Sequence, residues 1–311
     1  MGLPRIIYVP GKNPKPAAEL HRAALWRCLL EGVRRVDPAA GRQLAERPEV
    51  FHLAAWSERY YGVVRAFGDE ADIEVLCAKA GADARDRAEA LSWRRRWARI
   101  MYMVADHFSF LIGLLPDPAV RSAVAETERY FRNREGVGQA VREFVKAPLR
   151  AAFAVGEPVL LIGHSMGSII AYDALWELCC EEPADGRLDL LLTVGSPLGM
   201  HYVQRRLRGY FAHTGLRHPR NVRRWVNIAA QGDLTALDPE VRGHFDAMVR
   251  TGVTEEISDL HADVFTWFRD RHGLNVHRSY GYLIEPHVAA TVADWWQRHA
   301  GAATRPPKVV L

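Results

Sequence analysis

A serine lies at the centre of a glycine-flanked pattern, Gly163-His164-Ser165-Met166-Gly167. The pattern G-x-S-x-G places a serine hydroxyl on a sharp turn between a strand and a helix, where it can act as a nucleophile. The apolar run 158–162 before it and the helical run 168–178 after it supply this context. A Cβ atom at either flanking position would clash in so tight a turn, which explains the two glycines. We therefore predict that Ser165 is a nucleophile, the alternative being an ordinary strand-to-helix turn.

A serine hydroxyl is a poor nucleophile unless a base takes its proton and a carboxylate orients the base. In folds with this turn, the chain order is Ser, then Asp or Glu, then His. Asp233 follows the apolar run 224–230 and is the favoured acid, with Asp238 in reserve. Asp189 stands at the amino end of its predicted strand, which is the wrong edge of the sheet. A turn aspartate that only binds its own backbone is the alternative for Asp233.

The base is harder to assign because the chain has 13 histidines. It should come after the last strand and before the closing helix. His277 occupies this position, and we predict that it is the base. His287, inside the first turn of the closing helix, is a weaker candidate, as are His261 and His272 in the preceding segment.

Two backbone N–H groups are needed to stabilise the oxyanion that forms during acyl transfer. One should belong to Met166, directly after the nucleophile. The other should come from the loop "PGKNPKP", which follows the first predicted strand, so Gly11 or Lys12 is the candidate. The glycine would let the backbone approach a substrate closely.

Strands that alternate with helices must position these groups, and this pattern predicts an α/β fold with a mainly parallel sheet and helices on both faces. Residues 81–155 are strongly helical without a convincing strand, which predicts a helical insertion before the nucleophile strand and a candidate cap or lid. With no linker and no repeat, residues 1–311 are expected to form one domain. The predicted strands are 5–9, 49–55, 158–162, 188–194, 224–230 and, more weakly, 273–278; the clearest helices are 17–36, 168–178 and 286–299.

Composition excludes several classes of protein. The 311 residues are 49% hydrophobic and carry a net charge of +4, so a large core is expected and disorder is not. Basic residues cluster at 94–99, 204–208 and 217–224, which fits solvated surfaces or contact with anionic lipid, and no nucleic-acid-binding motif accompanies them. The apolar stretch 100–115 is too short to span a membrane. Four cysteines without metal-ligand spacing, and no signal peptide, favour a cytoplasmic protein without a metal.

With these residues assembled, the chain resembles the α/β-hydrolases, and within them the lipase-like and GPI inositol-deacylase-like serine hydrolases. The resemblance rests on "YVPGK", "FHLAAW", "VLLIGHSMGSIIAYDAL", "TVGSPLG", "WVNIAAQGDL" and "NVHRSYGYL". It implies hydrolysis of a carboxylic ester or related acyl substrate through an acyl-enzyme, without a cofactor. It also implies that Ser165, Asp233 and His277 are the nucleophile, acid and base.

Other functions of the same fold remain open at this stage. An acyltransferase or thioesterase would use the same three residues, and a catalytically silent binding module would keep only the fold. A further hypothesis places the acyl pocket or lid in the stretch 100–115, so that a charge at Leu114 would reduce activity on longer acyl chains.

Overall fold

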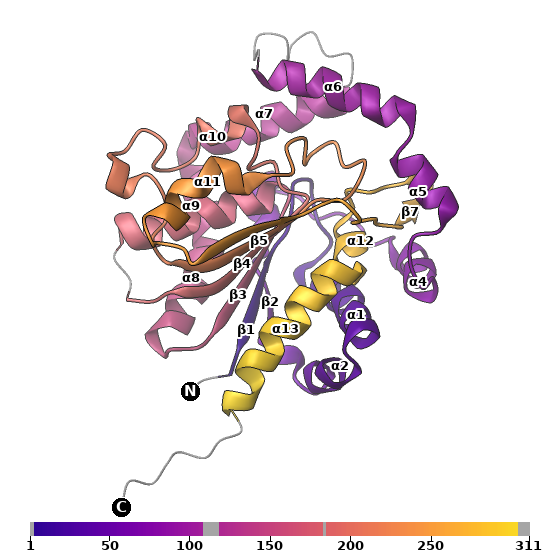
Figure 1. Ribbon diagram of the computed structural model, residues 1–311, viewed down its shortest axis with the longest axis horizontal. Helices are drawn as coiled ribbons and strands as arrows, with labels where there is room; N and C mark the ends of the chain where they lie inside the picture. Colours follow the sequence, from indigo (N-terminus) through magenta and orange to yellow (C-terminus); the bar gives the residue numbers. More distant parts are fainter. Residues whose placement is uncertain (1–2, 108–117, 183–184, 304–311) are drawn as a thin grey trace, which may run out of the picture.

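A six-stranded parallel sheet forms the centre of the molecule (Figure 1). The computed structural model describes residues 3–107, 118–182 and 185–303. The strand order is β2-β1-β3-β4-β5-β6, and all five pairings are parallel. The α/β class and the parallel sheet predicted from the sequence are therefore confirmed. The strands are β1 (Arg5–Val9), β2 (Phe51–Leu53), β3 (Val159–His164), β4 (Leu188–Val194), β5 (Val222–Ile228) and β6 (Glu256–Leu260).

Helices cover both faces of the sheet (Figure 1). Alternate residues of each strand point to opposite faces, so that Leu160 and Ile162 of β3 enter one core and Val159 and Leu161 enter the other. The first core is closed by α1 (Ala18–Val36), α2 (Pro38–Ala45), α4 (Glu70–Ala78), α12 (Ser279–Ile284) and α13 (Pro286–Ala303). The second is closed by α3 (Ser57–Tyr61), α8 (Val137–Ala154), α9 (Met166–Cys180), α10 (His201–Gln204) and α11 (Val241–Arg250).

The last strand of the sheet differs from the prediction. Residues 273–278 do not join the main sheet; Gly273–Leu274 (β8) pairs only with Arg269–Asp270 (β7), in an antiparallel ribbon. The sixth strand is instead β6, "EISDL", in which only Ile257 is buried. A strand that buries a single apolar residue has little apolar periodicity, so the sequence pattern did not reveal it.

The segment predicted as a helical insertion is helical where it is described, but its helices have two different positions. α5 (Ala84–Ala90) and α6 (Trp93–His107) lie beyond the carboxyl ends of the strands (Figure 1), whereas α8 packs directly on the sheet through Val141, Val145 and Leu149. α7 (Pro118–Arg132) precedes α8, and short 3₁₀ turns lie at Pro48–Val50, Arg134–Gly136 and Thr214–Leu216. Residue Leu114, and most of the apolar stretch around it, lies outside the described residues.

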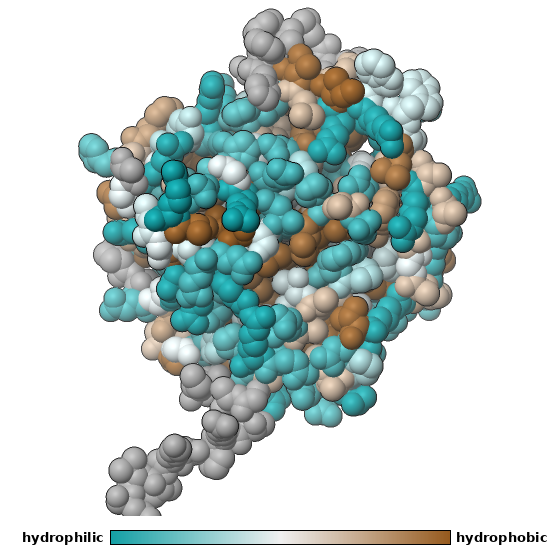
Figure 2. All heavy atoms as spheres, viewed as in Figure 1, coloured by the Kyte–Doolittle hydropathy of each residue, from teal (hydrophilic) through white to brown (hydrophobic). Residues whose placement is uncertain are grey.

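One face of α6 is apolar and open to solvent. Trp93, Trp97, Ile100, Met101 and Val104 are all exposed. Figure 2 shows apolar side chains gathered over α6 at the top of the view. No helix in the described part of the chain is both long and apolar enough to cross a membrane.

Candidate active site

Ser165 occupies the turn between β3 and α9, in a strained backbone conformation. Its φ of 53° and ψ of −127° fall where residues with a side chain are rarely found. The Ser165 N–H donates to the carbonyl oxygen of Val194 at 3.1 Å, which ties the turn to β4. Such strain persists only where the surrounding structure imposes it, and it commonly marks functional sites.

The glycines on either side of this turn leave no room for a side chain. A Cβ atom on Gly163 would lie 2.7 Å from the Cα of Ser168, and one on Gly167 would lie 2.2 Å from the carbonyl oxygen of Val9. The steric reason that the sequence suggested for both glycines is therefore present in the structure. A Cβ atom on Gly11 would also lie 2.9 Å from the Cβ of Ser165, so the loop after β1 passes close to the serine.

The structure brings Ser165, His277 and Asp233 together in one hydrogen-bonded chain. The Ser165 Oγ lies 2.9 Å from Nε2 of His277, and the His277 Nδ1 lies 2.8 Å from Oδ2 of Asp233. Asp233 follows β5, and His277 lies between β8 and α12. Ser165 is only 3% exposed, and the loop after β1 passes close to it at Gly11.

Asp233 is held as a buried carboxylate. Burial alone would raise its pKa, but the charge and hydrogen bond of His277, the Tyr282 hydroxyl and the Thr235 N–H lower the pKa to about 2. Tyr282 donates to Oδ2 at 2.6 Å, and the backbone N–H of Thr235 donates to Oδ1 at 2.8 Å. The carboxylate is therefore ionised at neutral pH and can stabilise an imidazolium at His277.

The ring of His164 contacts the backbone and the ring of His277. Its Nε2 lies 2.9 Å from the carbonyl oxygen of His277, and the two rings are 4.8 Å apart. Burial, and then the nearby His277, lower the pKa of His164 well below its ordinary value. His164 is therefore neutral, with Nε2–H donating to this carbonyl and helping to fix the backbone that carries His277.

The backbone donors predicted for an oxyanion lie around Ser165. Met166 begins α9, whose first N–H groups have no partner inside the helix. The N–H groups of Gly11 and Lys12 lie in the loop that approaches Ser165, and they donate to no other group in the described part of the chain. All three N–H groups are thus free to bind a developing negative charge.

The other acid and base candidates have partners elsewhere. Asp238 binds His244 at 2.7 Å and does not contact His277. The other three histidine candidates also have partners: His261 lies near Glu240, His272 accepts from Arg271, and His287 pairs with Glu285.

A pocket of about 250 Å³ opens onto Ser165. It is lined by the loop after β1, by α1, by Arg65 and by the segment that carries His277. Residues 81–155 contribute none of its described walls. The lining consists of Gly11, Lys12, Asn13, Pro14, Lys15, Pro16, His21, Arg65, His164, Ser165, Asn275, His277, Arg278, Ser279 and Tyr280.

Helix α6 is fixed to the loops that carry Asp233 and His277. The Arg95 guanidinium donates to the carbonyl oxygens of Gly232 at 3.1 Å and Leu274 at 2.8 Å. At the other end of α6, Asp106 accepts hydrogen bonds from the N–H groups of His201 and Tyr202 at the start of α10. Helix α6 therefore connects the two loops that carry Asp233 and His277 to the start of α10.

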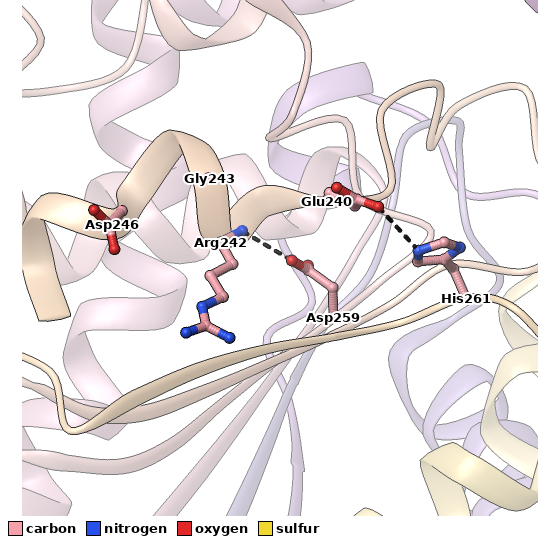
Figure 3. Close-up of a pocket in the computed structure, with 6 residues that line it drawn as sticks. All are labelled: Glu240, Arg242, Gly243, Asp246, Asp259 and His261. Atoms are coloured by element: carbon pink, nitrogen blue, oxygen red, sulfur yellow. Dashed lines mark hydrogen bonds and ion pairs between the residues drawn. The ribbon is translucent and has the colours of Figure 1, made fainter.

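A second, larger hollow of about 440 Å³ lies beside the start of α11 (Figure 3). Its carboxylates already have partners, because Asp259 accepts from the N–H groups of Val241 and Arg242, and Glu240 lies 3.5 Å from Nε2 of His261. It contains no nucleophile. Across the part of the chain that the structure describes, no group of three or more His, Cys, Asp or Glu residues is placed to hold a metal ion.

Comparison of the chain with protein-family models, with curated proteins and with solved structures finds no match.

Several residues of the site were not predicted from the sequence. Tyr282, His164 and Arg95 act through neighbours that are distant in the chain, so no local spacing marks them. His164 stood inside the serine pattern, but that pattern allows any residue at this position.

Proposed function

We propose that the chain is a serine hydrolase that cleaves carboxylic esters through an acyl-enzyme. The observation that carries this proposal is the pair of distances that join Ser165 to His277 and His277 to Asp233, 2.9 and 2.8 Å. Such distances are within the range over which a base takes the proton of a nucleophile. The strained turn at Ser165 and the free N–H groups around it give further support.

In the first half of the reaction, His277 Nε2 accepts the proton of the Ser165 hydroxyl while Oγ forms a bond to the ester carbonyl carbon. The N–H groups of Met166 and of Gly11 or Lys12 bind the oxyanion. Asp233 stabilises the imidazolium. The bond from carbon to the leaving oxygen then breaks, and His277 returns its proton to the departing alcohol.

In the second half, water takes the place of the alcohol. His277 removes a proton from water while the water oxygen attacks the acyl carbon. The tetrahedral oxyanion again binds to the N–H groups of Met166 and of Gly11 or Lys12. The bond to Ser165 Oγ breaks, and the proton returns to this oxygen. A carboxylic acid leaves, so atoms and charge balance over the cycle without an oxidant or a cofactor.

The order of these residues also supports the α/β-hydrolase resemblance. Ser165 follows the central strand β3, Asp233 follows β5, and His277 comes last, which is the order of nucleophile, acid and base in that fold. We therefore propose an α/β-hydrolase architecture.

Fluorophosphonate labelling tests the proposal. The reagent loses fluoride to an activated serine, so the wild type should gain the mass of one adduct, and Ser165→Ala should gain none. Ser258→Ala, which alters a serine of edge strand β6 outside the site, serves as the matched control and should label as the wild type does. Absence of an adduct on folded wild type would contradict the proposal.

A product assay then separates hydrolysis from acyl transfer. With a simple aryl ester in water, mass spectrometry should detect free carboxylic acid in step with the released alcohol. Alcohol release without free acid, together with acylation of an added acceptor, would assign a transferase instead.

A further inference from the structure

Four cationic side chains surround the pocket beside Ser165. Lys12 and Lys15 come from the loop after β1, Arg65 follows α3, and Arg278 is the neighbour of His277. No aspartate or glutamate is among the lining residues. The wall that faces a bound substrate is therefore positively charged.

Carboxylates neutralise only part of the positive charge of these four side chains. Asp69 binds both Arg65 and Arg278 and is the carboxylate that both guanidiniums share. In the described residues, no carboxylate lies within ion-pair distance of Lys12 or Lys15. The Lys15 Nζ instead donates to the carbonyl oxygen of Lys12 at 2.6 Å. A positive charge thus remains unmatched in a half-buried position beside the nucleophile.

The pocket is also built to hold these cations in place. The backbone N–H of Arg65 donates to the carbonyl oxygen of Lys15 at 2.9 Å, which joins two segments that are distant in the chain. The Arg278 guanidinium lies 5.2 Å from the centre of the Tyr280 ring and 5.7 Å from that of Phe268. Cations fixed in this way lose little conformational freedom when they bind an anion.

The rest of the lining does not suit a long hydrocarbon chain. The described walls contain no Leu, Ile, Val, Phe or Met. The volume of about 250 Å³ is also below that of usual pockets for drug-sized ligands, roughly 300–1,000 Å³.

We propose that this pocket binds a carboxylate or phosphate group carried by the substrate, so that the enzyme prefers esters with a negative charge close to the scissile carbonyl. The inference rests on the proposed ester hydrolysis and names the substrate class for the same site. A phosphate of a soluble ester and a phosphate of a lipid headgroup present the same chemistry to the cations, and the test distinguishes them.

Lys15 makes this preference dependent on pH. Burial, together with Arg278 and Arg65, lowers the pKa of Lys15 to about 7, so part of its positive charge is lost above this pH. His21, which faces the same pocket, is neutral because burial lowers its pKa to about 3. The preference for anionic over neutral esters should therefore decline as the pH rises through 7. The groups that face Lys15 are Lys12, His21, Arg65, Asp69 and Arg278.

The experiment compares kcat/KM on matched esters. The acyl series consists of phenyl esters of glutaric, pentanoic and 5-aminopentanoic acids, which are anionic, neutral and cationic. The alcohol series compares acetylated glycerol phosphate with acetylglycerol, and a lipid arm compares vesicles containing phosphatidic acid with vesicles containing diacylglycerol. We expect kcat/KM for the anionic ester to exceed that for the neutral ester by about tenfold or more in one series, as hydrogen bonds to a charged group would give.

Variants assign the preference to the pocket. Lys15→Met and Arg65→Gln should each reduce the anionic-to-neutral ratio about tenfold. Arg59→Gln is the matched control, because Arg59 is an exposed cation on nearby α3 outside the lining, and the ratio should not change. A ratio near one in every series, or a preference for the cationic ester, overturns the inference, as does an equal ratio in wild type and both pocket variants.

A binding measurement separates failure of this inference from failure of the proposed function. In calorimetric titrations, the wild type and Ser165→Ala should both bind glycerol 3-phosphate and glutarate. Lys15→Met should bind both ligands with lower affinity. Binding without fluorophosphonate labelling would keep the anion pocket and reject the hydrolase. Labelling without anion binding or preference would keep the hydrolase and reject the pocket.

Discussion

Asp233 shows how a single side chain is prepared for its role. It is fully surrounded by protein, where a carboxylate is costly, and three donors compensate this cost: His277, Tyr282 and the N–H of Thr235. Because its folded pKa is about 2, below the ordinary value of 3.8, ionised Asp233 stabilises the fold at neutral pH. This contribution is lost as the pH falls toward 2. Tyr282 is thus a positioning residue that acts through Asp233.

Replacing Tyr282 with phenylalanine tests that role. We expect kcat to fall about tenfold, since a hydrogen bond to a charged group contributes roughly 1.5–3 kcal/mol. The pKa of Asp233 should rise, which removes part of its contribution to stability, so the variant should unfold at a higher pH than the wild type in an acid titration followed by circular dichroism.

The control is Tyr172→Phe, which removes a buried hydroxyl that binds His218 at 2.9 Å, remote from Ser165. An unchanged kcat together with an unchanged pH of acid unfolding in Tyr282→Phe would contradict the assigned role.

At the scale of elements, α6 connects the two loops that carry Asp233 and His277. Arg95 contacts both loops through carbonyl oxygens, although it belongs to a run of arginines that the sequence suggested to be a solvated surface. Arg94 and Arg96 beside it are exposed. Within the described part of the chain, Arg95 contacts both loops, and Arg94 and Arg96 do not.

Arg95→Met should loosen both loops. We expect the free energy of unfolding to fall by about 1–3 kcal/mol, since two hydrogen bonds are lost and two carbonyl groups lose a partner. Activity on a neutral ester should fall several-fold, and amide hydrogen exchange should accelerate at residues 230–236 and 274–278.

Arg96→Met removes an equal charge from the same helix without these contacts. If both variants behaved alike, Arg95 would not hold the loops.

The sequence predicted those elements whose pattern is local. The apolar run of β3, the glycines around Ser165 and the strand before Asp233 are each readable within a few residues. Strand β6 was missed because it buries only Ile257, and the charged pocket was missed because Lys15, Arg65 and Arg278 meet only after folding. A pattern along the chain cannot reveal groups that tertiary packing brings together.

At the scale of the whole molecule, two apolar cores lie on opposite faces of the sheet, and an ionic cluster joins the helices of the second face. Glu177 of α9 is 2% exposed and binds Arg142 at 2.6 Å and Lys146 at 2.8 Å, both from α8. Burial opposes the charge of Lys146, but its carboxylate partners raise its pKa. The cluster fixes how α8 and α9 lie on the sheet.

Glu177→Gln would leave two buried cations without their shared partner. The free energy of unfolding should fall by about 3–5 kcal/mol, the usual effect of breaking a buried ion pair from one side. Urea denaturation followed by circular dichroism measures this change.

Glu181→Gln is the matched control, because Glu181 ends the same helix in an exposed position, and its effect should stay within about 0.5 kcal/mol. A loss below 1 kcal/mol in Glu177→Gln would show that the cluster is dispensable.

The parallel pairing of β1 with β3 has a consequence for synthesis of the chain. Residues 5–9 pair with residues 159–163, so the first strand leaves the ribosome long before its partner exists. Lys12 and Lys15 of the pocket follow this early segment, whereas Ser165, Asp233 and His277 are translated later. A nascent chain can therefore assemble neither the cationic pocket nor the hydrogen-bonded group of Ser165, His277, Asp233 and Tyr282 until residue 282 has emerged.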